Sequence, residues 1–157
     1  MASFEVIAMA LAPQRYLSKF SDYYLRLGAS RVRIFFDGSL QESSPPSGVE
    51  LVECDDEFWR TAKVPRPAAV EDRQRLVYNR AYASARSDWV LIVDIDEFVF
   101  GDGSLSAVLA QASGKYEVVR LVRRRPCLST EIGFPAIMAR KPSGDRAIAT
   151  LPRSCRI

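Results

Sequence analysis

The segment SDWVLIVDIDEF, residues 87–98, places five consecutive apolar residues directly before a cluster of three acids. An apolar run without polar alternation predicts a strand that is buried on both faces, as inside a parallel sheet. In an extended chain Asp94 and Asp96 share one face and lie about 6.5 Å apart. Such acids either mark the exit of the strand into solvent or hold a hard divalent cation together with phosphate and water.

The size and composition of the chain predict a single domain over residues 1–157. Its 157 residues are 48% apolar, which suffices for a core and excludes a disordered chain. No run approaches the roughly 18–20 apolar residues that cross a bilayer, and the N-terminus lacks a basic signal region. The three cysteines are widely spaced and form no C-x-x-C, so we expect reduced thiols in a cytoplasmic protein.

The net charge of +3 is unevenly distributed along the chain. Residues 1–114 carry 12 basic and 16 acidic side chains, whereas residues 115–157 carry 10 basic and 3 acidic ones. The basic segment RLVRRR, residues 120–125, is either a solvated surface or a contact for phosphate, lipid or nucleic acid. The chain has no histidine, which excludes histidine bases, histidine metal ligands and Ser-His or Cys-His dyads.

The order of predicted elements alternates between strands and helices. Strands are expected at residues 5–10, 31–36, 49–54, 89–93 and 116–122. Helices are expected from Pro13 to a C-cap at Gly28, from an N-cap at Asp72 to about residue 86, and over residues 105–112. This alternation predicts an α/β fold with a mixed, mostly parallel sheet flanked by helices. Asp37 and Asp94 then both follow strands, at the edge where such sheets bind ligands.

Two stretches, LRLGASRVRIFFDGS (residues 25–39) and YNRAYASARSDWVLIVDIDEF (residues 78–98), resemble family 2 glycosyltransferases. The shared pattern is a strand ending in D-G-S, a helix Asn, and a strand ending in D-x-D. Fifteen positions separate Asn79 from Asp94, and the acidic motif is similar to that of the subgroup with D-x-D-E-F. The resemblance covers roughly residues 5–100 and implies a GT-A fold.

The resemblance also implies a ligand and a role for each matching residue. It implies a nucleoside diphosphate sugar as donor, a sugar or lipid-linked acceptor, and Mn²⁺ or Mg²⁺ as the metal. Asp37 would contact the nucleoside, and Arg73, six positions before Asn79, would lie beside the nucleotide. Asp94 would face the ribose or a metal-bound water, and Asp96 would bind the metal, so both are candidate metal ligands.

Each of these residues also has a purely structural interpretation. Asp37 is then only an Asx-type turn former. In its binding role we expect Asp37→Ala to weaken nucleotide binding and to change stability by no more than about 1 kcal/mol, the usual scale for a surface turn residue. Arg73 is an exposed helix arginine, and Asn79 orients neighbouring backbone. Glu97 is expected to bond to backbone N–H groups, and Phe98 is expected in the core.

The catalytic base of the transfer step is not identified by any motif. Sugar transfer by inversion needs a carboxylate that deprotonates the acceptor hydroxyl, and Glu131 and Asp145 are the candidates after the basic segment. The chain departs from the subgroup in its turn ALAPQRY after the first strand, and it is shorter than the family's domains.

These features predict a metal-dependent glycosyltransferase, with three alternatives left open. A degenerate or truncated member would bind nucleotide without transferring sugar. A phosphatase would use D-x-D as nucleophile and acid, but Phe98 stands where that class has Thr or Val. A nucleic-acid binder would use the basic C-terminal third, although we do not expect nucleic acid to be the partner.

Overall fold

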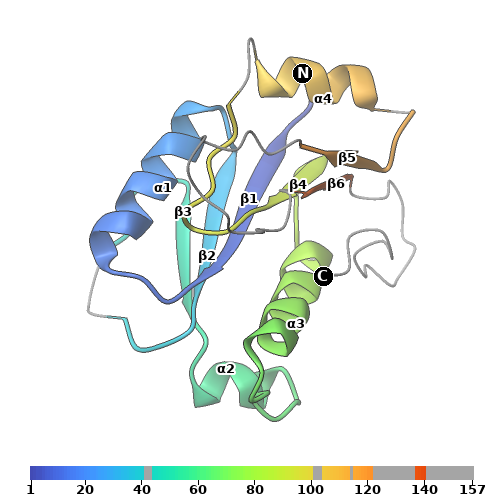
Figure 1. The fold of residues 1–157 in the computed structure, drawn as a ribbon. Coiled ribbons are helices and arrows are strands. Elements are labelled where there is room, and N and C mark those ends of the chain that lie inside the picture. Colours follow the sequence, from blue (N-terminus) through green and yellow to red (C-terminus); the bar gives the residue numbers. More distant parts are fainter. Residues whose placement is uncertain (41–43, 101–103, 114, 122–136, 141–157) are drawn as a thin grey trace, which may run out of the picture.

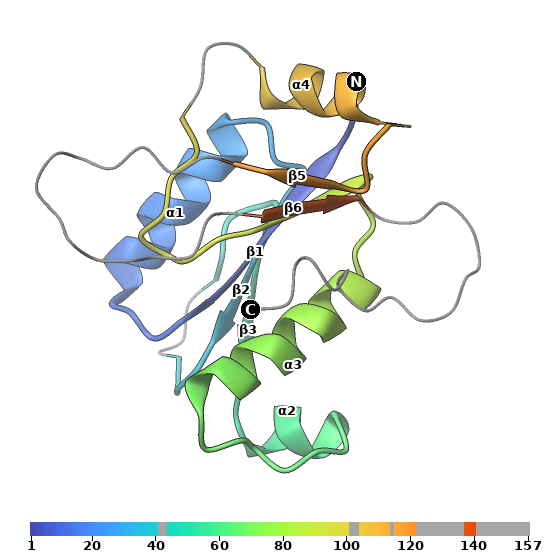
Figure 2. The same ribbon diagram turned by 45° about the vertical axis from the view of Figure 1, so that its right-hand side comes forward.

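The computed structural model describes residues 1–40, 44–100, 104–113, 115–121 and 137–140. These residues form one sheet with helices on both faces (Figures 1 and 2). The strands are β1 (Phe4–Ala10), β2 (Arg31–Phe36), β3 (Val49–Glu53), β4 (Trp89–Ile92), β5 (Val118–Arg120) and β6 (Ile137–Arg140). The helices are α1 (Gln14–Arg26), α2 (Asp56–Thr61), α3 (Val70–Ala83) and α4 (Leu105–Ala112).

The sheet has the strand order β3-β2-β1-β4-β6-β5. The first four strands are parallel, with Ala10 opposite Phe36 and Ile7 opposite Ile92. Strand β6 pairs antiparallel with β4, and β5 pairs antiparallel with β6. The predicted α/β class, with a mixed and mostly parallel sheet flanked by helices, is therefore confirmed.

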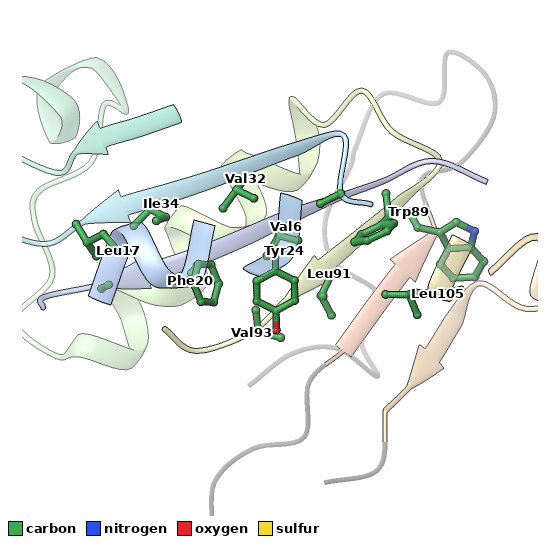
Figure 3. Close-up of a cluster of buried hydrophobic side chains, with 14 of the residues drawn as sticks. Val6, Leu17, Phe20, Tyr24, Val32, Ile34, Trp89, Leu91, Val93 and Leu105 are labelled. Carbon is green, nitrogen blue, oxygen red and sulfur yellow. The ribbon is translucent and has the colours of Figure 1, made fainter. Parts of the chain in front are cut away.

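Strict alternation along the strands divides the core into two layers. Even-numbered residues of β1 and β2 pack against α1 and α4, as Figure 3 shows for Val6, Val32 and Ile34 around Phe20 and Tyr24. The odd-numbered residues face the other way. The second layer includes Ile7 and Met9 of β1, Phe35 of β2, Trp59 of α2, and Val77, Tyr78, Ala81 and Tyr82 of α3. Both faces of the central strands are thus buried, which explains their continuous apolar sequence.

A buried charged pair fixes the C-terminal end of α3 to the sheet. Arg33 is 7% exposed and donates to the Ala81 carbonyl at 3.0 Å and to the Ser84 hydroxyl at 2.9 Å. Glu5, 1% exposed, lies 4.0 Å from the same Arg33 nitrogen and accepts from the Arg86 backbone N–H at 3.2 Å. These contacts satisfy backbone groups where the helix ends, because the last carbonyls of a helix have no partner inside it.

The helix ends differ in part from the predicted ones. Gly28 follows the C-cap of α1 with φ of +99°, a conformation that favours glycine, as predicted. Helix α3 begins at Val70 with Ala69 as its N-cap, so the prediction of Asp72 as N-cap is wrong. Asp72 lies in the first turn instead, where a carboxylate complements the helix dipole.

Helix α2 was not predicted, because its six residues give too short a pattern to show helical periodicity. A capping signal is nevertheless present in the sequence. The Asp55 side chain accepts a hydrogen bond from the Phe58 backbone N–H at 2.8 Å, the usual N-cap geometry. None of the helices among the described residues has the length and apolar character needed to span a membrane.

Candidate functional site

The strand order of the sheet reverses between β1 and β4. From β1 the chain passes through α1 on one face to β2, and it returns through α3 on the other face to β4. The connections that lead into β2 and into β4 therefore lie on opposite faces of the sheet, whereas the loops that leave β1 and β4 both pass to the face covered by α1 and α4 (Figure 1). In open α/β sheets, ligands bind at the carboxyl ends of the strands beside such a point.

Asp37 stands at this edge, directly after β2, and its carboxylate is buried. The residue is 9% exposed, and its backbone N–H donates to the Ala10 carbonyl at 2.9 Å. Alternation from Phe35 turns the Asp37 side chain toward the α3 face. There Oδ1 accepts from Arg66 at 2.8 Å, and Oδ2 accepts from Arg73 Nε at 3.0 Å. The interpretation of Asp37 as a surface turn residue is therefore wrong.

Arg73 lies in the first turns of α3 and joins three backbone segments. Its Nη2 is 2.9 Å from Asp37 Oδ2, and its Nη1 donates to the carbonyls of Pro67 and Ala68 at 2.9 and 2.7 Å. The side chain is only 15% exposed. The structure thus brings Asp37 and Arg73 into direct contact, and the interpretation of Arg73 as an exposed helix arginine is wrong.

Arg66 is the member of this cluster that sequence analysis missed. It lies in the connection between α2 and α3, and its side chain is 46% exposed. Its hydrogen bond to Asp37 and the charge of that carboxylate raise the pKa of the guanidinium. No local signal identifies it, because Val-Pro-Arg-Pro shows only an irregular segment; its partner is 29 residues away.

Cys54 lies beside the same cluster, after β3. Its backbone N–H donates to the Phe36 carbonyl at 2.8 Å, and the residue is buried. Burial, followed by the charge of Asp37, raises the pKa of the thiol to about 12. The thiol is therefore protonated at neutral pH and is no nucleophile in the folded protein.

The second cluster is the acidic loop, which we define as residues 94–100. Asp94 is half-buried, Asp96 is exposed, and Glu97 is half-buried. Glu97 Oε2 accepts from the Asp94 backbone N–H at 3.2 Å, and the Glu97 N–H donates to the Asp94 carbonyl at 3.0 Å. Glu97 thus closes the turn by bonding to backbone, as expected. Among the described residues, Asp96 has no hydrogen-bond or ion-pair partner.

Aromatic side chains of α1 attach the acidic loop to the fold. The Tyr24 hydroxyl donates to the Glu97 carbonyl at 2.9 Å, and the Tyr23 hydroxyl donates to the Val99 carbonyl at 2.6 Å. Phe98 lies with its ring edge-on to Tyr23 at 4.9 Å and parallel to Tyr24 at 6.3 Å. It is 37% exposed, so it covers the core from the surface and is not inside it as predicted.

Tyr78 reaches the end of β1 from α3, and Asn79 follows it in the same helix. The buried Tyr78 hydroxyl accepts from the Met9 backbone N–H at 3.3 Å. Burial, with the nearby charges of Asp94 and Glu97, raises the pKa of Tyr78, so its hydroxyl remains protonated. Asn79 is half-buried in the middle of α3, where it caps neither end of the helix.

The carboxylates of the acidic loop fit a cation whose coordination the ligand completes. Asp94 and Asp96 supply hard oxygen donors, the type that Mg²⁺ and Mn²⁺ prefer. In the described part of the chain, no group of three or more Asp, Glu, Cys or His side chains is arranged to hold a metal alone. Two carboxylates with phosphate and water are a common way to hold Mg²⁺. Glu131 and Asp145, the candidate bases, lie outside the described residues.

Comparison with known proteins supports the fold and nothing finer. No family model and no curated protein matches the chain. A solved structure described as "Crystal Structure of a Mycobacterial Protein" is similar to it, with a TM-score of 0.55 and 16% identity. The match covers 89% of this chain and 54% of the mycobacterial chain, so this chain spans about half of that protein's length. At this identity the likeness concerns the α/β architecture alone.

Proposed function

We propose that the chain is a metal-dependent glycosyltransferase domain that binds a nucleoside diphosphate sugar. The observation that supports this most strongly is the position of two polar clusters at one edge of the sheet. Asp37 with its arginines follows β2, and Asp94 and Asp96 follow β4, so only β1 separates them. A ligand lying across the end of β1 would meet both clusters.

The two clusters differ in charge, which suits the two halves of such a ligand. The acidic loop carries three carboxylates within four positions, whereas the cluster around Asp37 carries two arginines. Bound at the acidic loop, Mn²⁺ or Mg²⁺ would neutralise the charge that develops on a leaving diphosphate. In this proposal Asp94 and Asp96 hold the metal, while the cluster around Asp37 binds the nucleoside.

Transfer to an acceptor needs more than these two clusters. It requires a wall that positions a sugar or lipid-linked hydroxyl beside a base, and positioning alone supplies several kcal/mol of a barrier. The donor side belongs to residues 1–100, whereas the candidate bases Glu131 and Asp145 come later. The second candidate function is therefore a degenerate or truncated module that binds nucleotide without transferring sugar. A cytoplasmic location is part of both proposals.

The test of this proposal is a panel of thermal-shift and calorimetric titrations. Uridine, guanosine, cytidine and adenosine diphosphates are each titrated with Mn²⁺ and with EDTA. At least one should bind with Mn²⁺ and lose about tenfold or more in affinity without it, roughly 1.4 kcal/mol. If none of the four binds with the metal present, the glycosyltransferase proposal and the nucleotide-module proposal both fail.

A further inference from the structure

We infer that Arg66, and not Arg73, is the arginine that contacts the nucleoside, and that Arg73 is a positioning residue for Asp37. The inference rests on the proposed function and concerns the same site. It reverses the role that the family resemblance implies for Arg73. The observation behind it is how many N–H groups each arginine has already used within the fold.

Arg73 has almost no hydrogen-bonding capacity left for a ligand. A guanidinium has five N–H donors in a fixed fork. In Arg73, Nε and Nη2 lie within 3.0 Å of Asp37 Oδ2, and Nη1 donates to the carbonyls of Pro67 and Ala68. With 15% of the side chain exposed, this fork fixes the carboxylate of Asp37 and the chain before α3.

Arg66, in contrast, uses few of its N–H donors within the described part of the chain. Its one hydrogen bond within the described part of the chain is from Nη2 to Asp37 Oδ1, at 2.8 Å. The side chain is 46% exposed, three times the exposure of Arg73. Its remaining N–H groups are therefore available to a ligand at the carboxyl edge of the sheet.

The carboxylate of Asp37 retains one acceptor site, and the geometry places it beside Arg66. A carboxylate offers about four lone-pair sites, two on each oxygen. Oδ2 lies against both Nε and Nη2 of Arg73, whereas within the described part of the chain Oδ1 accepts only from Arg66. The open acceptor is therefore on Oδ1, next to the open donors of Arg66.

An acceptor beside a donor is complementary to a ligand that carries a donor beside an acceptor. The hydrogen-bonding edge of a nucleobase has this pattern, and so does the 2′,3′-diol of a ribose. A diphosphate offers acceptors alone and would leave the Asp37 oxygen facing another anion. The site therefore suits the nucleoside half of the ligand.

The experiment separates nucleoside binding from phosphate binding. Affinities with Mn²⁺ are measured by calorimetry for the tightest of the four nucleoside diphosphates and for inorganic pyrophosphate. Arg66→Met keeps the length of the side chain but removes its donors. It should weaken nucleoside diphosphate binding about tenfold and change pyrophosphate binding less than twofold. Arg60→Met, at an exposed arginine of α2, is the matched control and should change neither.

The role of Arg73 is tested by coupling to Asp37. Arg73→Met and Asp37→Asn should each reduce the preference for nucleoside diphosphate over pyrophosphate, and the double variant should lose no more than either one, because contacting residues are not additive. A purely structural Arg73 would lower the melting temperature without changing this preference. Arg75→Met, at an exposed arginine of the same helix, is the control.

The possible outcomes distinguish a failure of the inference on Arg66 from a failure of the proposed function. If Arg66→Met weakens both ligands equally, or neither, the inference is overturned while the proposed function stands. Equal affinity of the wild type for both ligands also overturns it. If the wild type binds neither ligand, the proposed function fails, and the inference with it. Repeating the titration with the 2′,3′-dideoxy nucleotide distinguishes the two supporting cases: an Arg66 effect that persists assigns the contact to the base, and one that vanishes assigns it to the ribose.

Discussion

At the scale of single residues, Asp37 shows how burial changes the meaning of a turn motif. In Asp-Gly-Ser the aspartate is a usual turn former, yet here its carboxylate is 8% exposed and held by two arginines. Removing a buried carboxylate leaves its cationic partners with unsatisfied donors, which costs more than losing a surface contact. The side chain thus contributes to stability as well as to the site.

We therefore predict that Asp37→Ala lowers the free energy of unfolding by about 2–4 kcal/mol. Urea denaturation followed by circular dichroism measures this, with Asp72→Ala as the control because Asp72 pairs with Arg75 on the exposed surface of α3. The control should change stability by no more than about 0.5 kcal/mol. A loss below about 1 kcal/mol for Asp37→Ala would restore its interpretation as a surface turn residue.

For Asp96 the expected effect is on binding and not on stability. Its side chain is exposed and has no partner among the described residues. Asp96→Asn removes a charged oxygen ligand at nearly constant shape, so Mn²⁺-dependent nucleotide affinity should fall at least tenfold, about 1.4 kcal/mol. The melting temperature without ligand should be unchanged. Equal affinity of variant and wild type in calorimetry with Mn²⁺ would remove Asp96 from the metal site.

At the scale of elements, α1 holds the acidic loop at the end of β4. The Tyr24 and Tyr23 hydroxyls donate to two carbonyls of this loop, at Glu97 and Val99. A carboxylate on an unsupported loop would lose conformational entropy on binding a cation, since ordering a residue costs about 1–2 kcal/mol. Helix α1 therefore prepares the position of the acids although it supplies none of them.

Tyr24→Phe should accordingly affect both stability and metal-dependent binding. It removes one part-buried hydrogen bond at constant packing, at a cost of about 1 kcal/mol in unfolding free energy. It also frees the Glu97 carbonyl, so the affinity for nucleoside diphosphate with Mn²⁺ should fall several-fold. Tyr16→Phe, at an exposed position of the same helix, is the control. If Tyr24→Phe loses stability but keeps full affinity, the loop does not need this support.

At the scale of the whole molecule, Cys54 reports on opening of the fold. Its thiol is buried between the sheet and α2, and burial with the charge of Asp37 raises its pKa to about 12. The pKa of this thiol is normal in the unfolded chain and raised in the fold. The resulting contribution to stability is fully present at pH values below the thiol pKa of the unfolded chain. That contribution is lost as the pH rises, because the unfolded state then releases its proton first.

The prediction has two measurable parts. Stability should decline between about pH 9 and pH 12, and Cys54→Ala should decline less over this range. At pH 8 alkylation of the peptide that contains Cys54, followed by mass spectrometry, should be slow in buffer and fast in denaturant. Rapid alkylation in buffer at pH 8 would contradict the buried position of the thiol.

The sequence determines most where a residue's environment depends on its immediate neighbours. The unbroken apolar run before Asp94 indicated a strand buried on both faces, and the β-branched and aromatic residues at 31–36 indicated a second strand. Gly28 follows the C-cap of α1 in the left-handed conformation, so glycine marks the end of this helix as predicted. These features arise from local sterics and from the need to bury apolar surface, both of which are expressed in short windows.

The arrangement of Asp37 depended on tertiary structure, because its two partners lie 29 and 36 residues away in the chain. No periodicity marks Arg66, and the burial of Asp37 follows only once α3 packs on the odd-numbered face of β2. The sequence by itself determined the α/β fold, the strand that ends in acids and the candidate residues at its carboxyl edge. Both arginines bond to Asp37, and only the tertiary structure decided which of them has its remaining donors satisfied within the fold and which one stays exposed. The physical reason is that the partners of these donors are brought together only in the folded chain.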